Sequence, residues 1–322
     1  MVERIVVSDK LGAAGLELLR AIPGFDVQDV AGKGAEALDR ALPDAVVLVV
    51  RSETKVTAAV MAKAPRLRII ARAGMGVDTI DLAEANRRKI AVLTAPGANA
   101  NSVAEFTFAL LLGLVRKVPA AVASLGAGAW DRKSFEGTEL RGKTLGLIGL
   151  GRVGSGVASI ARGFGMQVEA HDPFLTQRDV DPLGVTLLPL DDVLGGADVI
   201  SLHAKLTPET RHVLDDARLA LTRKGVLIVN TSRGALIDDA ALVRALRSGH
   251  VAGAALDVYD PEPLAADSCL RGAPNILLTP HLAASAKEAQ TRVALEIGAA
   301  VQAALLNGDL RAAVNRKEIG AA

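Results

Sequence analysis

The chain has 322 residues, half of them hydrophobic, with 37 basic and 36 acidic residues and a formal net charge of +1. This length suits two domains, and the balanced charge excludes the basic surface typical of nucleic-acid or anionic-membrane binding. The single cysteine, Cys269, excludes an intrachain disulfide and suits a reducing cytoplasm.

Neither a leader nor a membrane span is expected. The first ten residues carry charges where a secretory signal needs its apolar stretch. The longest apolar run, 106–115, is too short to cross a bilayer. No Cys/His cluster has metal-ligand spacing, so we expect a cytoplasmic protein without a bound metal.

The first hundred residues alternate between short apolar runs and helical patterns. Strands are predicted at 5–8, 25–30, 45–51, 67–71 and 90–95, and an amphipathic helix at 14–22. Strands that alternate with helices indicate a parallel sheet. We therefore predict a small α/β unit, and it lacks a G-x-G-x-x-G motif.

A turn-rich break at 96–102 marks the expected change of domain. A long helical pattern follows it, from Val103 towards Leu125. The mixed segment 126–140 holds the only tryptophan, Trp130. We interpret this segment as an arm that is a candidate for a subunit interface, although burial within the chain is equally allowed.

The stretch 141–174 has the order that a dinucleotide site needs. A strand at 144–148 runs into Gly149, Gly151 and Gly154, and then come a helix, a second strand and Asp172. The first glycine permits a tight turn, the second lets the backbone approach a pyrophosphate, and the third lets the helix pack closely on the strand. Asp172 would accept hydrogen bonds from the ribose hydroxyls and repel the 2′-phosphate of NADP. The motif favours NAD, the alternative being a plain strand-to-helix turn.

Six strands are predicted for this second domain, which is the complement of a full doubly wound sheet. A long helix at about 287–306, capped by Asn307 and Gly308, could cross back to the first domain. We therefore predict a discontinuous substrate-binding domain, 1–100 plus 285–322, and an NAD-binding Rossmann domain, 101–284.

Polar side chains follow three late strands at their carboxyl ends, where doubly wound sheets bind ligands. Arg233 has a guanidinium fork suited to a substrate carboxylate and carbonyl. Asp257 could face a nicotinamide. His281 would take or give the proton of a 2-hydroxy acid, and Glu262 would raise its pKa. In isolation, Arg233 would be a surface residue and His281 a structural one.

Seven stretches now identify a resemblance to the D-isomer-specific 2-hydroxyacid dehydrogenases, closest to their phosphoglycerate-oxidising branch. They cover nearly the whole chain and lie at 50–60, 72–82, 135–154, 201–210, 230–238, 253–263 and 280–290. The fold implied is α/β, with two doubly wound parallel-sheet domains, the larger a Rossmann NAD-binding domain and the smaller flavodoxin-like. The resemblance also implies a homodimer built on the cofactor domains, with a tetramer as an alternative and the 126–140 arm in the interface.

The resemblance assigns roles to individual residues. The catalytic positions are Arg233, Glu262 and His281. The cofactor positions are Gly149, Gly151, Arg152, Val153, Gly154, Asp172, Thr231, Ser232 and Asp257. The substrate positions are Arg51, Ser52, Gly74 and Asn99, of which Arg51 and Ser52 match the loop that faces a substrate phosphate.

The chain departs from the family pattern at Glu53, Met75, Lys205 and Ala283. An inward-facing Glu53 would weaken an anion site near Arg51. The chain lacks the long C-terminal extension of some relatives, so a short form without a regulatory domain is expected.

Three functions follow from the resemblance. The first is NAD-dependent oxidation of 3-phospho-D-glycerate to 3-phosphohydroxypyruvate, which opens serine biosynthesis. The second is a general glyoxylate or hydroxypyruvate reductase. The third is a non-catalytic, NAD-sensing protein that binds partners.

Overall fold

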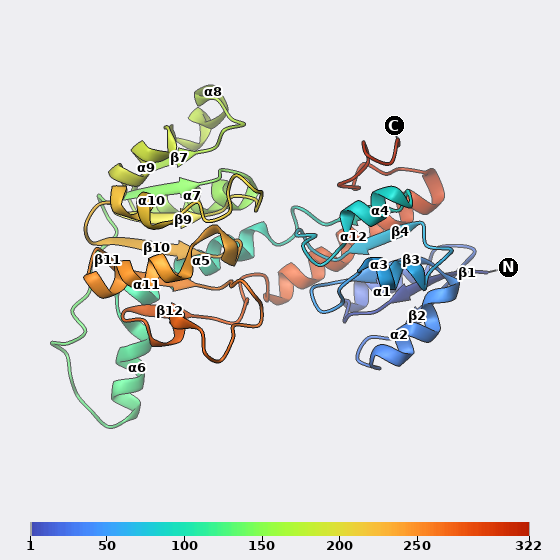
Figure 1. Ribbon diagram of the computed structural model, residues 1–322, viewed down its shortest axis with the longest axis horizontal. Coiled ribbons are helices and arrows are strands. Elements are labelled where there is room, and N and C mark those ends of the chain that lie inside the picture. The colour runs from blue at the N-terminus through green and yellow to red at the C-terminus, as the bar shows by residue number, and fades with distance from the viewer. Residues whose placement is uncertain (1, 322) are drawn as a thin grey trace. The chain divides into compact units, whose positions relative to one another are not determined.

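The computed structural model describes residues 2–321, and its contacts divide the chain into two compact units. Unit 1 comprises the residues up to Asn99 and those from Ser285 onward, and unit 2 comprises Ala100–Ala284. Figure 1 shows a sheet with flanking helices in each unit.

The five strands of unit 1 are parallel and lie in the order β2-β1-β3-β4-β5. They are β1 (Glu3–Val7), β2 (Phe25–Asp29), β3 (Ala45–Val50), β4 (Ile69–Arg72) and β5 (Ala91–Thr94). The helices are α1 (Ala13–Arg20), α2 (Ala35–Ala41), the 3₁₀ turn η1 (Leu42–Asp44), α3 (Ala58–Ala62), α4 (Leu82–Arg87) and α12 (Lys287–Asn307). This strand order is the flavodoxin-like one.

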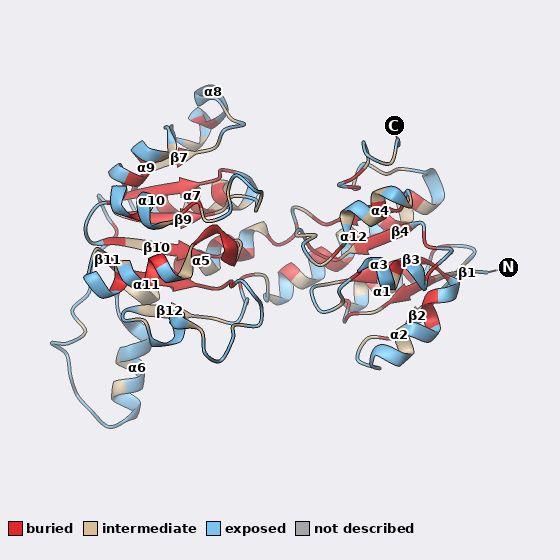
Figure 2. Ribbon diagram, in the orientation of Figure 1, coloured by how far each residue is buried: buried red, intermediate tan, exposed pale blue. Residues whose placement is uncertain are grey.

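Both faces of the unit 1 sheet are buried because alternate residues of each strand point to opposite sides. In β3, Val47 and Val49 belong to the core under α1 and α12, whereas Leu48 and Val50 belong to the core under α2, α3 and α4. Figure 2 shows the central strands β3 and β4 buried and the outer helix faces exposed. Helix α12 packs so closely on α1 that a Cβ on Gly15 would lie 2.5 Å from the carbonyl oxygen of Ala294.

The C-terminal segment extends this unit as an antiparallel partner of β5. Leu93 pairs with Ala313, and the buried side chain of Asn315 accepts from the Val92 N–H and donates to the Ile90 carbonyl. The end of the chain thereby covers the edge of β5.

The seven strands of unit 2 are parallel, in the order β12-β11-β10-β9-β6-β7-β8. They are β6 (Thr144–Ile148), β7 (Gln167–His171), β8 (Thr186–Leu187), β9 (Val199–Leu202), β10 (Val226–Asn230), β11 (Val251–Leu256) and β12 (Ile276–Leu278). The helices are α5 (Ala100–Val115), α6 (Val118–Gly126), α7 (Arg152–Gly163), α8 (Gln177–Val180), α9 (Leu190–Gly196), α10 (Asp216–Leu221) and α11 (Asp239–Ser248), with 3₁₀ turns η2 (Asp181–Leu183), η3 (Gly234–Leu236) and η4 (Cys269–Gly272).

The first six of these strands have the Rossmann order, and β12 extends the sheet beyond β11. One face packs against α5 and α7 and the other against α9, α10 and α11. The two parallel, helix-flanked sheets confirm the predicted fold class. The prediction of six strands was wrong by one, because β8 has only two residues and too little periodicity to be recognised.

The helical pattern predicted from Val103 towards Leu125 is two helices rather than one. Lys117 has a left-handed φ of 53°, and α5 and α6 meet there at a bend of 61°. Helix α5 is mostly buried, whereas α6 has no buried residue. Among residues 2–321, no single helix is long and apolar enough to cross a membrane, although the bent pair α5–α6 meets that criterion by length and composition together.

Candidate active site

The turn between β6 and α7 requires glycine at two positions and leaves a third one open. Gly149 has a φ of 91°, and a Cβ there would lie 2.6 Å from the Ala204 nitrogen. A Cβ on Gly154 would lie 2.4 Å from the Gly149 carbonyl oxygen. Gly151 has no atom within 4 Å of an added Cβ. The turn therefore closes tightly on itself and presents free space at Gly151.

Helix α7 begins directly after Gly151, which makes no side-chain cap. The N–H groups of its first turn, at Arg152 and Val153, are therefore suited to the oxygens of a phosphate. Asp172, just beyond β7, accepts from the Leu150 N–H at 2.9 Å through Oδ2 and from the Phe174 N–H at 3.0 Å through Oδ1. These bonds hold the half-buried carboxylate beside the glycine turn.

This arrangement fits NAD. The open face at Gly151 would admit the pyrophosphate, and Asp172 would meet the adenosine ribose and disfavour a 2′-phosphate. When bound, NAD supplies a carbon that accepts or gives a hydride. The contacts of the individual residues stay predictions.

The loop after β10 carries Arg233 and is fixed by its own side chains. Asn230 donates through Nδ2 to the Arg233 carbonyl at 2.8 Å and accepts from the Ser232 N–H. The Ser232 hydroxyl donates to the Ala204 carbonyl, which ties this loop to the one after β9. The buried Thr231 hydroxyl shares a hydrogen bond of 2.8 Å with Thr107 of α5. Both predicted cofactor-side hydroxyls are therefore engaged within the protein.

Gly234 brings this loop against the loop that bears Glu262. A Cβ on Gly234 would lie 2.1 Å from the carbonyl carbon of Tyr259. No side chain larger than hydrogen fits there without moving the backbone. Because Arg233 immediately precedes this contact, its position is coupled to the loop after β11.

Glu262 and His281 are joined directly, although they lie nineteen positions apart. The His281 Nδ1 is 2.8 Å from Glu262 Oε2, and Glu262 Oε1 accepts from the Tyr259 N–H at 3.0 Å. Both side chains are partly exposed. With Nδ1 committed to the carboxylate, Nε2 is the ring atom left for a ligand.

The electrostatics of the pair favour a protonated histidine. The hydrogen bond that His281 donates to Glu262 raises the pKa of His281 above its ordinary value and outweighs the opposing effects of burial and Arg233. Burial raises the pKa of Glu262, but the hydrogen bond and charge of His281, the Tyr259 N–H and Arg233 outweigh it, so that this pKa lies below its ordinary value. The positive charge of Arg233 lowers the pKa of both side chains, so Arg233 lies within electrostatic range of the pair.

Asp257 is completely buried and organises the loop that carries His281. Its Oδ1 accepts from the Thr279 hydroxyl at 2.6 Å and the Leu282 N–H at 2.8 Å, and its Oδ2 accepts from the Ala283 N–H at 2.8 Å. His281 itself has a left-handed φ of 53°. We expected Asp257 to face a nicotinamide, and that contact stays a prediction; the observed bonds serve the loop.

Sequence reasoning missed two residues that support this constellation, Asn230 and Tyr259. The Tyr259 hydroxyl donates to the carbonyls of Leu256 and Thr279, at 3.1 and 2.8 Å, and so joins the loops after β11 and β12. Its being the only tyrosine was the one available signal. An asparagine at the last position of a strand was the signal for Asn230.

His203, directly after β9, is a further half-buried side chain near the glycine turn. Its Nε2 lies 2.8 Å from the Ser201 hydroxyl, and Nδ1 has no partner among residues 2–321. Burial lowers its pKa to about 3, which keeps this imidazole neutral at pH 7.

The predicted substrate residues of unit 1 follow three of its strands. Arg51 and Ser52 follow β3, and the Arg51 guanidinium donates to the Lys10 carbonyl at 3.3 Å. Gly74 has a φ of 150°, its N–H donates to the Arg72 carbonyl, and the Arg72 guanidinium fills the space where a Cβ would lie. Asn99 is buried, and its Oδ1 has no partner within the part of the chain that the structure describes.

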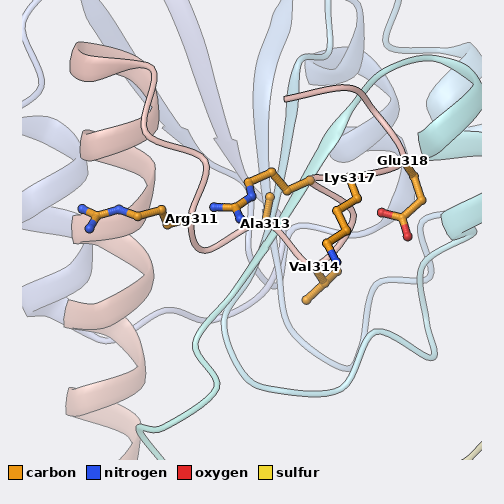
Figure 3. Close-up of a pocket in the computed structure, with 6 residues that line it drawn as sticks. Arg311, Ala313, Val314, Lys317 and Glu318 are labelled. Carbon is orange, nitrogen blue, oxygen red and sulfur yellow. The ribbon is translucent and has the colours of Figure 1, made fainter. Parts of the chain in front are cut away.

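A separate pocket of about 360 Å³ lies in unit 1 along the C-terminal segment. Figure 3 shows the side chains that line it, which are Arg311, Ala313, Val314, Arg316, Lys317 and Glu318. Arg311 is already paired with Asp309 at 2.6 Å. None of the predicted site residues lines this pocket.

Residues 108–283 match the family described as D-isomer specific 2-hydroxyacid dehydrogenase, NAD binding domain. The chain is 45% identical over 294 residues to a D-3-phosphoglycerate dehydrogenase of Bacillus subtilis, covering 91% of this chain and 55% of that protein. It therefore spans about half the length of that curated relative.

Two solved structures cover nearly the whole chain. A glyoxylate reductase from Paecilomyes thermophila has a TM-score of 0.86 at 29% identity, covering 98% of this chain and 99% of that one. A D-lactate dehydrogenase from Aquifex aeolicus, complexed with NAD and lactic acid, has a TM-score of 0.82 at 30% identity, covering 96% and 97%.

Proposed function

Because the chain belongs to the D-isomer-specific 2-hydroxyacid dehydrogenases, we propose that it oxidises 3-phospho-D-glycerate to 3-phosphohydroxypyruvate with NAD as the hydride acceptor. This is the reaction that opens serine biosynthesis. The observation that carries the proposal is the hydrogen-bonded pair of Glu262 and His281 within electrostatic range of Arg233. A 45% identical D-3-phosphoglycerate dehydrogenase supports the choice of substrate.

His281 acts as the general base in oxidation. Its Nε2 takes the proton of the C2 hydroxyl as the C2 hydrogen departs as hydride, so that the C2–O bond becomes a carbonyl. Glu262 accepts a hydrogen bond from Nδ1 and stabilises the imidazolium that results. Acid–base catalysis of this kind contributes about 10²–10⁴-fold in rate.

Arg233 binds the substrate carboxylate and polarises the oxygen at C2. Its planar guanidinium can donate two parallel hydrogen bonds to a carboxylate, which a lysine does not match. The bonds of Asn230 and the close approach at Gly234 fix the backbone from which Arg233 projects. Substrate is therefore oriented by a side chain whose loop is already rigid.

Arg51 and Ser52 are the proposed ligands of the substrate phosphate. The test is oxidation of 3-phospho-D-glycerate beside reduction of hydroxypyruvate and glyoxylate, by wild type and Arg51→Ala. We expect Arg51→Ala to raise the KM for phosphoglycerate at least tenfold, or about 1.4 kcal/mol of lost binding. A preference for the unphosphorylated acids, with no effect of Arg51→Ala, would contradict the proposal.

That opposite result defines the second candidate, a glyoxylate or hydroxypyruvate reductase. The structural likeness to a glyoxylate reductase favours it. The same assay separates the two functions.

We also propose that the chain works as a cytoplasmic homodimer, with α6 and the following arm in the interface. Helix α6 buries none of its side chains, and Val122, Leu125 and Trp130 are 66%, 59% and 83% exposed. Apolar side chains gathered on one short segment are typical of a protein interface. A second copy of the chain would bury them.

A further inference from the structure

A buried carboxylate lies beneath the loop that carries Arg51. Asp9, two residues beyond β1, is 3% exposed. Its Oδ2 accepts from the Arg51 N–H at 2.6 Å and from the Thr54 N–H at 3.1 Å, and its Oδ1 accepts from the Thr54 hydroxyl. The carboxylate therefore bonds to both ends of the segment 51–54.

The position of Asp9 in the sheet is the one where ligands bind in this fold. Strands β1 and β3 are neighbours, with Val7 paired to Val49. The chain leaves β1 for α1 on one face of the sheet and leaves β3 for α3 on the other. The sheet thus reverses its strand order between β1 and β3, and doubly wound sheets bind ligands outside the strand ends at such a point.

Burying Asp9 has a free-energy cost that only its hydrogen bonds offset. An ionised carboxylate without partners is not tolerated in a protein interior, and bonds to such a group are about twice as strong as neutral ones. Three donors come from Arg51 and Thr54, so this stabilisation depends on the conformation of segment 51–54. The Arg51 side chain, in turn, is tied to the Lys10 carbonyl.

We propose that Asp9 is a positioning residue for substrate specificity: it holds segment 51–54 so that Arg51 and Ser52 can bind a phosphate. This inference rests on the proposed function. Asp9 does not touch the phosphate, and as an anion it would repel it. Asp9 contributes to phosphate binding by fixing the geometry of the loop, and this effect outweighs the repulsion between its carboxylate and the phosphate.

The test compares 3-phospho-D-glycerate with D-glycerate, which differ only by the phosphate. The measured quantity is the ratio of their kcat/KM values in wild type, Asp9→Ala, Asp9→Asn, Arg51→Ala and the double variant Asp9→Ala/Arg51→Ala. Asp29→Ala is the matched control, since Asp29 is the last residue of the neighbouring strand β2 and its carboxylate also holds a loop, through the Ala31 N–H at 3.0 Å.

We expect Asp9→Ala to lower the ratio at least tenfold, through a higher KM for the phosphorylated acid. Asp9→Asn should keep most of the wild-type ratio. Its amide oxygen can accept from the Arg51 and Thr54 N–H groups, while its NH₂ donates to the Thr54 hydroxyl oxygen. The double variant should lower the ratio by less than the product of the two single effects, since Asp9→Ala acts in part through Arg51. Asp29→Ala should leave the ratio unchanged.

Equal losses on both substrates in Asp9→Ala, or additive effects with Arg51→Ala, would overturn the inference by making Asp9 a general structural residue. If wild type shows no preference for the phosphate and Arg51→Ala changes nothing, the proposed function itself fails and the inference falls with it. Should Asp9→Ala not fold, Thr54→Val removes one donor only. That variant should lower the ratio about threefold, and an unchanged ratio would overturn the inference.

Discussion

At the scale of single residues, the site depends on which atoms are already engaged. Glu262 accepts a hydrogen bond from Nδ1 of His281 and another from the Tyr259 N–H, so Nε2 is the atom proposed to react. The hydrogen bond to Glu262 has a larger effect on the pKa of His281 than burial or Arg233, which both oppose it. Removing that one carboxylate should therefore reverse the direction of the shift.

Glu262→Gln should move the pH dependence of both reaction directions to lower pH. Oxidation requires neutral His281, and reduction requires the protonated form. Because the folded-state pKa of His281 is raised, the active form for reduction is lost only as pH rises through that raised value. Without Glu262 the loss comes at lower pH, and oxidation becomes active at lower pH. Profiles of kcat/KM measured in both directions check this.

The rate should fall as well, by up to about 10²-fold, since the imidazolium loses its stabilising partner. Glu209→Gln, at an exposed carboxylate of the same unit, is the control and should leave both profiles in place. Unchanged profiles in Glu262→Gln would mean that another group titrates.

The sequence predicted which residues form the candidate site, but not the hydrogen bonds that hold their loops in place. Arg233, Glu262 and His281 were identified because each follows a strand at its carboxyl end. Tyr259 was missed, since its hydroxyl bonds to Thr279, twenty positions away, and no local pattern predicts such a pair. The catalytic roles themselves stay predictions.

At the scale of elements, periodicity predicted the alternating strands and helices of both units. It failed where the backbone changes without a change in pattern. The apolar residues resume at Val118, after Arg116 and Lys117, with helical spacing, but the left-handed Lys117 separates α5 from α6. The glycine turn was predictable because its three glycines have different physical tasks, and these tasks lead to different expected variants.

Gly151→Ala and Gly154→Ala should fail in different ways. The Gly154 variant places a methyl 2.4 Å from a backbone oxygen and should lower the free energy of unfolding by about 1–3 kcal/mol. The Gly151 variant meets no atom and should fold normally, but its methyl occupies the space for the pyrophosphate. Its KM for NAD should rise about tenfold, or about 1.4 kcal/mol.

Thermal unfolding without cofactor and NAD titrations distinguish the two effects. Gly163→Ala, near the end of the same helix and also without a neighbour within 4 Å, is the matched control for both measurements. If Gly151→Ala binds NAD as wild type does, the cofactor does not approach this glycine.

At the scale of the whole molecule, each of the two sheets has a hydrophobic core on both faces, whereas α6 is poorly buried. Unit 1 is completed by both ends of the described chain, since α12 packs on α1 and Ala313 pairs with β5. Unit 2 leaves α6 without a buried side chain. Figure 2 shows this helix mostly exposed. We therefore expect a second copy of the chain to cover this apolar, exposed helix.

Val122→Asp should therefore weaken the dimer. Val122 is 66% exposed on α6, so a carboxylate there costs the single chain little, whereas a charge in the core of an interface must lose its water. We expect wild type to sediment as a dimer at micromolar concentration and Val122→Asp to raise the dissociation constant at least tenfold. Leu221→Asp, at an apolar residue of α10 that is 48% exposed, is the control and should stay dimeric. Equal dimer dissociation constants for Val122→Asp and Leu221→Asp would mean that the interface lies elsewhere. A monomeric wild type would contradict the proposed dimer. Circular dichroism of Val122→Asp verifies that α6 is still folded, which keeps a lost dimer from being mistaken for a lost helix.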